Sequence, residues 1–149
     1  YNLIDYMTPL ENVKLTSKLP PEPILEKMGL TKEEMKRNVL QLSGGQQQRV
    51  AIARALAGEA PIILADEPTG NLDTASSIEI MEIFSELHKE GATVVVVTHE
   101  ENIAAFTHRI IRFQDGRVVS DEKNPNPTIT GRENHMAGLY HVSNRDKEA

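Results

Sequence analysis

Residues 42–49 read Leu-Ser-Gly-Gly-Gln-Gln-Gln-Arg, and this short stretch predicts much of the local structure around it. Ser43 is a good helix N-cap, and Gln46, three residues later, completes a capping box. Between them, Gly44 and Gly45 allow another group to approach the backbone closely. We expect a helix to begin here. The free N–H groups of its first turn and the positive end of its dipole would form an anion-binding site.

Two apolar runs downstream predict the sheet. The runs cover residues 61–65 and 92–97, and neither is interrupted by a charged side chain. Such runs indicate strands that are buried on both faces, as in parallel α/β sheets. Residues 74–90 between them have apolar side chains at helical spacing, and Gly91 ends the pattern. Strand, helix and strand over this length predict a βαβ unit and an α/β fold.

Three candidate site residues follow these runs. Asp66 and Glu67 come directly after the first run, and His99 comes after the second. In open α/β sheets, ligands bind at the carboxyl ends of the strands. The plainer alternatives are that the two acids begin a polar loop and that His99 is only a hydrogen-bond donor at a strand end.

Shorter elements complete the expected secondary structure: helices within 8–37 and over 100–106, and strands over 109–113 and 117–119. Asp115 and Gly116 between the last two strands are a hairpin signal. Further on, the prolines in Asn-Pro-Asn-Pro at 124–127 break regular structure. The chain is polar beyond them, and we expect a disordered tail over residues 121–149.

Composition narrows the class of protein. The 149 residues have the length of one domain, and the net charge of −6 comes from interspersed acids and bases, so we expect no nucleic-acid partner. The chain has no cysteine, which excludes disulfides and thiolate metal sites. It shows no secretory signal and no apolar run of membrane-spanning length. We therefore expect a cytoplasmic protein that reaches a membrane only through a partner.

Several motifs stand in the order and spacing found in ABC-type ATPases. Leu-Ser-Gly-Gly-Gln at 42–46 resembles the signature motif of that family, and the apolar run that ends on Asp66 and Glu67 resembles its Walker B motif. Pro-Thr-Gly-Asn-Leu-Asp at 68–73 resembles its D-loop, in the variant common in the branch for lipoprotein release, macrolide export and peptide-antibiotic export. Thr-His at 98–99 resembles its switch histidine.

The resemblance covers about residues 1–120 and implies a fold. It implies a partial P-loop NTPase (RecA-like) parallel sheet, with a small helical subdomain over residues 1–42 and the ATPase core over residues 43–120. The sequence contains no Gly-x-x-x-x-Gly-Lys-Ser/Thr, the loop that wraps the phosphates in such ATPases. The chain therefore resembles the C-terminal part of a nucleotide-binding domain, with the phosphate loop and the Q-loop glutamine expected before Tyr1.

The resemblance also implies a role for each side chain at the strand ends. Asp66 would coordinate Mg²⁺, often through water, which suits an ion that keeps most of its own waters. Glu67 would orient or deprotonate the water that attacks ATP, and His99 would contact the γ-phosphate. An imidazole suits that contact because it can donate a hydrogen bond to a phosphate oxygen near neutral pH.

The signature residues would act on a neighbouring subunit. In the family, Ser43, Gly44, Gly45 and Gln46 would close over the ATP that the facing subunit holds in its phosphate loop. Asp73 lies in the D-loop and would cross the same interface. Asp73 also stands where the helix over 74–90 needs an N-cap, and the two roles are compatible.

These expectations describe the ATPase subunit of an ABC transporter, which couples ATP binding and hydrolysis to transport at the inner face of the cell membrane. Its partners would be a second ATPase subunit, most simply a homodimer, and a transmembrane permease subunit. Without the phosphate loop, we expect this chain alone not to turn over ATP. The alternative is a non-enzymatic fragment that acts only by self-association or by binding a partner, because an absent central strand would leave sheet edges unpaired. A non-transport ABC protein of translation or DNA repair is less favoured, because those proteins usually carry tandem domains or a long coiled coil.

Overall fold

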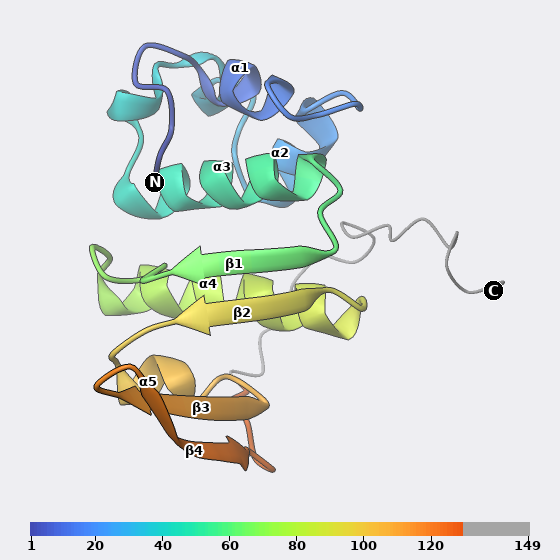
Figure 1. The fold of residues 1–149 in the computed structure, drawn as a ribbon. Helices are drawn as coiled ribbons and strands as arrows, with labels where there is room; N and C mark the ends of the chain where they lie inside the picture. Colours follow the sequence, from blue (N-terminus) through green and yellow to red (C-terminus); the bar gives the residue numbers. More distant parts are fainter. Residues whose placement is uncertain (130–149) are drawn as a thin grey trace, which may run out of the picture.

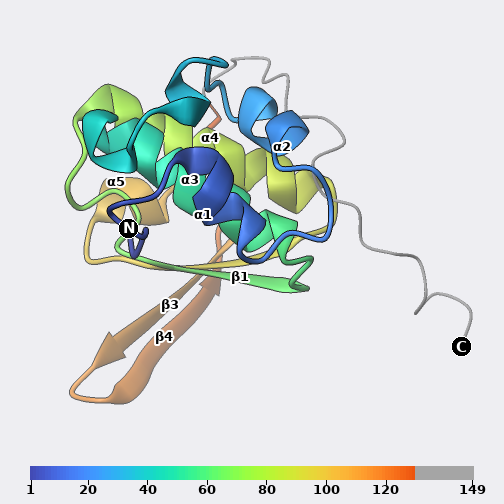
Figure 2. The same ribbon diagram turned by 90° about the horizontal axis from the view of Figure 1, so that it is seen from above.

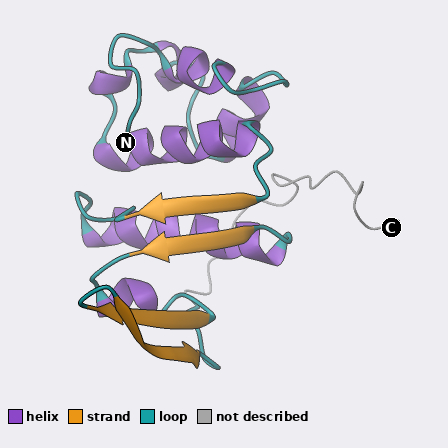
Figure 3. Ribbon diagram, in the orientation of Figure 1, coloured by secondary structure: helices purple, strands orange, loops and turns teal. Residues whose placement is uncertain are grey.

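The computed structural model describes residues 1–129. Its helical elements are α1 (Pro9–Lys14), α2 (Glu22–Lys27), the short 3₁₀ helices η1 (Glu34–Lys36) and η2 (Val39–Gln41), α3 (Gly44–Ala57), α4 (Thr74–Lys89) and α5 (Glu101–Ala104). Its strands are β1 (Ile62–Asp66), β2 (Thr93–Val97), β3 (Arg109–Gln114) and β4 (Arg117–Lys123). Figure 3 shows that only helices and loops precede β1. The helix expected to begin after the Ser43 cap is confirmed as α3.

The βαβ unit forms as predicted. β1 and β2 pair in parallel, from Ile62 opposite Thr93 to Asp66 opposite Val97. α4 connects them and runs beside the pair (Figure 1). Because the first and last residues of β1 are paired with the first and last residues of β2, the two strands end at the same edge of the sheet. The loops that follow them leave from that edge.

The expectation that both faces of these strands are buried is wrong. Ile63 and Ala65 of β1 are buried, whereas Ile62 and Leu64 are 52% and 78% exposed. The outward side chains of β2 follow the same pattern, and Val97 is 56% exposed. Figure 2 shows the reason: α3 and α4 lie on one side of β1 and β2, and no described helix covers the other side.

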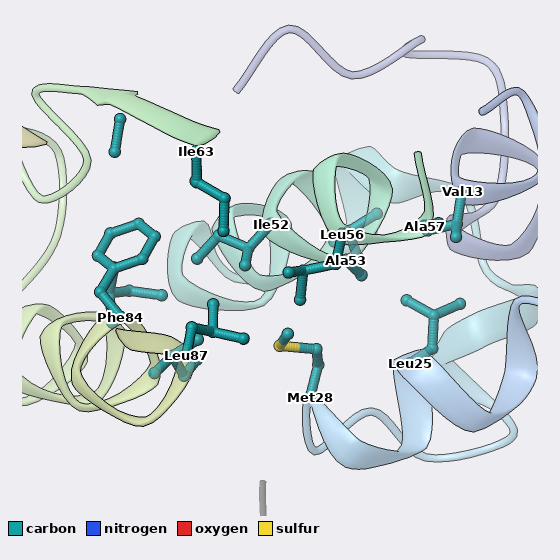
Figure 4. Close-up of a cluster of buried hydrophobic side chains, with 14 of the residues drawn as sticks. Val13, Leu25, Met28, Ile52, Ala53, Leu56, Ala57, Ile63, Phe84 and Leu87 are labelled. Atoms are coloured by element: carbon teal, nitrogen blue, oxygen red, sulfur yellow. The ribbon is translucent and has the colours of Figure 1, made fainter. Parts of the chain in front are cut away.

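One apolar core joins the helices to the inner face of β1. The side chains of α3 lie between those of α1 and α2 on one side and those of β1 and α4 on the other (Figure 4). Members of this core that Figure 4 labels include Val13, Leu25, Met28, Ile52, Leu56, Ile63, Phe84 and Leu87. Because residues from both sides of position 42 share this core, the proposed division into a helical subdomain and an ATPase core stays a prediction.

The hairpin is longer than expected. β3 and β4 pair antiparallel, and Asp115 and Gly116 between them have φ values of +49° and +74°. Positive φ at both positions is what a two-residue hairpin turn requires. β4 runs to Lys123, so the first residues of the expected tail belong to a strand. Asn124 and Thr128 of that expected tail donate backbone hydrogen bonds to His108 and Ala105, and its remaining residues, 130–149, lie outside the described residues.

Candidate functional site

Glu67 and His99 meet at the common end of the two parallel strands. The backbone N–H of Glu67 donates to the carbonyl of Val97 at 2.8 Å, which continues the ladder one step beyond β1. His99 follows β2 by two residues. Its Nδ1 lies 2.8 Å from Oε1 of Glu67. Two side chains that are 32 residues apart in the sequence are thus in direct contact.

The contact is a charge-assisted hydrogen bond. A carboxylate only accepts, so Nδ1 of His99 carries the hydrogen and donates it. The hydrogen bond to Glu67, and then its negative charge, raise the pKa of His99 above the ordinary value of 6.5. The imidazole is 81% exposed and the Glu67 side chain is 39% exposed, so the pair lies at the surface.

Two consecutive residues at this strand end, Asp66 and Glu67, carry carboxylate oxygens suited to a hard cation. The second oxygen of Glu67, Oε2, is buried and has no hydrogen-bond partner among residues 1–129. Asp66 is the last residue of β1 and is exposed, on the face that also carries Leu64. Carboxylate oxygens are the protein ligands that Mg²⁺ prefers, and one or two of them suffice. The residues present therefore fit a magnesium ion.

The first turn of α3 is capped as its sequence predicts. Ser43 Oγ accepts from the N–H of Gln46 at 3.2 Å, and Gln46 Oε1 accepts from the N–H of Ser43 at 2.9 Å. The side chain of Gln46 has a further partner, because its Nε2 donates to Oε1 of Glu34 at 2.7 Å. Glu34 also accepts from the N–H of Thr31, and this bond is the main reason that the pKa of Glu34 is lowered.

The two glycines of this turn sit against neighbouring side chains. A Cβ on Gly45 would lie 3.2 Å from the hydroxyl of Ser76 on α4, and a Cβ on Gly44 would lie 2.8 Å from the hydroxyl of Tyr1. Asp73 caps α4 by accepting from both the N–H and the hydroxyl of Ser76. These bonds lower the pKa of Asp73. Ser76 thus connects the start of α3 with Asp73, and the N-cap alternative for Asp73 is confirmed.

The candidate residues therefore form two groups. Asp66, Glu67 and His99 lie at the strand ends, and the side chains of the α3 turn lie with Asp73 at the starts of α3 and α4. The loop between β1 and α4 connects the groups, with hydrogen bonds from the N–H of Gly70 to the carbonyl of Glu67 and from the N–H of Leu72 to the carbonyl of Thr69.

Comparison with known proteins gives the family. The sequence model described as ABC transporter matches residues 2–70. A macrolide export ATP-binding/permease protein MacB from Chlorobium luteolum is 58% identical over 99 residues, which cover 66% of this chain and 15% of that protein. The protein of the same name from Aggregatibacter actinomycetemcomitans is 49% identical over 132 residues, which cover 81% of this chain and 20% of that protein. The chain belongs to the ABC transporter family.

Solved ABC cassettes agree in fold. The dimeric bacterial ABC transporter cassette MJ0796 is 44% identical with a TM-score of 0.71, and the match covers 83% of this chain and 59% of that one. Cassette cbiO1 from Clostridium perfringens has a TM-score of 0.72 at 28% identity. The fold is therefore that of a partial P-loop NTPase. The chain spans about a fifth of the length of the curated ABC relatives it matches. Within residues 1–129, no helix is long and apolar enough to cross a membrane.

Some long-range contacts of this ABC chain could not be predicted from its sequence, in contrast to the local ones. The spacing of Thr31 and Glu34, for example, predicts a capped turn, and that turn forms. Nothing local indicates that Glu34 also holds Gln46, because only the packing of η1 beside α3 brings them together. The buried Thr69 likewise donates to Glu100 at 3.3 Å, which joins the loops that leave β1 and β2. No signal in the sequence marks that pair.

Proposed function

We propose that this chain carries the signature, Walker B, D-loop and switch-histidine part of an ABC transporter ATPase subunit, and that the intact subunit couples ATP binding and hydrolysis to transport across a membrane. The observation that carries this proposal is the 2.8 Å contact between Glu67 and His99 at the shared edge of two parallel strands. Hydrolysis of a phosphoanhydride needs a group that orients water and a donor for the phosphate oxygens. A carboxylate and an imidazole at one strand edge have that chemistry.

Each side chain at this edge has a task in the proposal. Glu67 accepts a proton from the attacking water or orients it, and His99 donates to the γ-phosphate through its other ring nitrogen, Nε2. Asp66 would hold Mg²⁺, and Oε2 of Glu67, which has no partner within residues 1–129, would face the attacking water. When bound, that ion offsets the negative charge of the phosphates.

The first turn of α3 serves a different nucleotide. The amides of Gln46 and Gln47 bond to the Ser43 side chain and carbonyl, whereas those of Gly44 and Gly45, the first two of the helix, have no intrahelical acceptor. A helix N-terminus with two free donors attracts phosphate oxygens. With Gln46 fixed by the cap and Asp73 beside it, this surface would close over ATP that a facing subunit holds. The dimeric structure of the ATP-binding cassette MJ0796 bound to ADP and Pi supports such a two-subunit arrangement.

The partners follow from the relatives. Proteins similar to this chain are named export ATP-binding/permease proteins. We infer a transmembrane permease partner, a second ATPase subunit, and a location at the inner face of the cell membrane.

Amide NMR on the purified chain tests the site without requiring turnover. Mg²⁺ should shift the resonances of residues 65–67, and millimolar Mg·ATP should add shifts at residues 43–46 and at His99. Asp66→Asn should abolish the Mg²⁺ shifts, whereas Asp115→Asn, at an exposed hairpin turn, should leave them intact. Shifts confined to other segments, or shifts retained in Asp66→Asn, would contradict the proposal.

A turnover assay tests the expected inactivity of the chain alone. The sequence has no phosphate-wrapping glycine–lysine loop, so no phosphate release above background is expected. Phosphate release that Glu67→Gln abolishes would overturn this expectation.

A second candidate function is association without catalysis, and the open face of the β1–β2 sheet favours it. Ile62, Leu64, Val95 and Val97 on this face are between 44% and 78% exposed. Adjacent exposed apolar side chains on a short sheet mark an association surface. Light scattering should show dimers or larger species, and Leu64→Lys should reduce them. A monomer at high concentration would exclude this second function.

A further inference from the structure

A pocket of about 330 Å³ lies between α4, β2 and the start of β3, and none of the candidate ATPase residues lines it. Its floor is apolar, with Phe84 of α4, Val94 of β2 and Phe106 among its lining side chains. Two histidines, His88 and His108, are at its rim and are exposed. The proposed ATPase function uses neither histidine.

The two imidazoles are close to each other although they come from separate elements. His88 is in the last turn of α4, and His108 directly precedes β3. Their ring centroids are 4.5 Å apart, and their planes are tilted by 48°. The rings are therefore neighbours without being stacked in parallel.

One ring is already oriented. Nδ1 of His88 lies 3.3 Å from the carbonyl oxygen of Ala92, an acceptor, so Nδ1 donates to it and the neutral ring has its lone pair on Nε2. A backbone carbonyl that fixes a histidine in this way is the usual outer partner of a metal-binding imidazole. The imidazole of His108 has no hydrogen-bond partner in the described part of the chain, so one of its nitrogens can serve as the second ligand.

We propose that His88 and His108 together bind a divalent transition-metal ion, of which Zn²⁺ is the simplest probe. Zinc lies about 2.0–2.1 Å from each imidazole nitrogen, so two rings that share one ion have centroids roughly 4.5–5.5 Å apart. The observed 4.5 Å falls at the near end of that span. Imidazole suits zinc, copper and nickel, whereas Mg²⁺ requires oxygen ligands.

The surrounding charges permit a cation. The C-terminal end of α4, where His88 lies, is the negative end of the helix dipole. The basic side chains next to the two histidines in the sequence are in ion pairs, since Arg109 pairs with Asp121 and Lys89 pairs with Glu86. The described residues hold no cluster of three or more metal-ligating side chains, so water or an added ligand completes the coordination of the ion.

Such an ion would link two parts of the fold. α4 belongs to the main core, whereas β3 begins the hairpin that points away from it (Figure 2). An isolated two-stranded hairpin is only marginally stable. The metal would therefore hold the base of the hairpin to α4, and amide exchange around residues 107–110 should slow when the metal is present.

Calorimetric titration of the untagged chain with ZnCl₂ tests the proposal. Both histidines are exposed, so His88→Gln and His108→Ala should fold, which circular dichroism checks. Each variant should weaken binding at this site by about tenfold or more, because loss of an outer partner alone costs that much. The zinc-dependent slowing of exchange at residues 107–110 should disappear in both.

Two controls separate this site from other histidines. His99→Gln and a variant that replaces both His135 and His141 should keep the zinc affinity and the exchange effect, and MgCl₂ should produce neither. Zinc affinity that is unchanged in both His88→Gln and His108→Ala would overturn the proposal. So would affinity that is lost only in His99→Gln or in the variant at 135 and 141.

Discussion

Gly45→Ala should destabilise the chain although alanine is the better helix former. Gly45 is buried in the first turn of α3, and an added Cβ would lie 3.2 Å and 3.3 Å from Oγ and Cβ of Ser76. Ser76 cannot easily move, because Asp73 holds both its N–H and its hydroxyl. Overpacking of this kind costs about 1–3 kcal/mol. The gain in helix propensity is at most about 1 kcal/mol, so overpacking should win by about 1 kcal/mol.

Gly58→Ala is the matched control at the other end of the same helix. Gly58 is the C-cap of α3 with φ of −77°, which any residue can adopt, and an added Cβ would lie no closer than 3.4 Å to its neighbours. Alanine there should therefore stabilise the chain by about 0.4–1 kcal/mol, through the unfolded state. The two Gly→Ala changes are chemically identical and should shift stability in opposite directions.

Urea unfolding followed by circular dichroism at 222 nm measures both changes. Gly45→Ala should also lower the midpoint of thermal unfolding by about 2–4 °C. Ser76→Gly removes both close atoms, so in a double-mutant cycle the Gly45→Ala change should cost less by about 1 kcal/mol when Ser76 is already Gly. A Gly45→Ala variant more stable than the wild type, or a cycle without coupling, would refute the packing argument.

Other substitutions test the remaining contacts. Glu67→Gln should lower the pKa of His99, because the hydrogen bond and charge of Glu67 raise it, and histidine-selective NMR titration reads the change. Because the pKa of His99 is raised in the folded chain, the stability that this contact contributes is fully present below pH 6.5 and is lost as the pH rises through the folded-state pKa. His99→Gln should therefore lower the free energy of unfolding at acidic pH and leave it unchanged above the folded-state pKa. Asp73→Ala should lower the urea midpoint of unfolding at neutral pH. The pKa of Asp73 is lowered in the folded chain, so the stability that its carboxylate contributes is lost as the pH falls below 3.8, and the difference between variant and wild type should vanish there. Leu25→Ala, at a side chain with no exposed surface, should cost about 2–5 kcal/mol in urea unfolding, whereas Leu15→Ala, at a side chain 56% exposed, should stay within about 0.5 kcal/mol.

Local chemistry explains what could be predicted from the sequence. The start of α3 depends on Ser43 and Gln46, which are three residues apart, and the hairpin turn depends on Asp115 and Gly116 alone. Both signals act within one turn of the chain, so they do not depend on the rest of the fold. The pairing of β1 with β2 was also predictable, because the connecting helix over 74–89 has the length of a parallel crossover.

Burial and long-range contacts could not be predicted in this way. An apolar run indicates that a strand is buried, but whether one face or two is covered depends on elements elsewhere in the chain. Leu64 is 78% exposed because α4 covers only the opposite face. The bond between Glu34 and Gln46 likewise depends on how η1 packs beside α3. α5 ends at Ala104, before the expected residue 106, and Phe106 reaches the core from the turn that follows it.

The position of Glu67 joins local strain to the contact that defines the site. Along β1, side chains alternate between the two faces, so Asp66 is exposed. A regular strand would send the next side chain into the buried face. Instead Glu67 has φ of +45°, in the left-handed region that costs a non-glycine residue about 1–2 kcal/mol. The backbone turns there while its N–H still bonds to Val97, and the side chain lies against His99. Glycine would adopt that backbone at lower cost, so backbone conformation does not account for a glutamate at this position. The glutamate adds a hydrogen bond to the imidazole of His99 and a second carboxylate oxygen that has no partner within residues 1–129. Both features fit the proposed catalytic role of this strand edge.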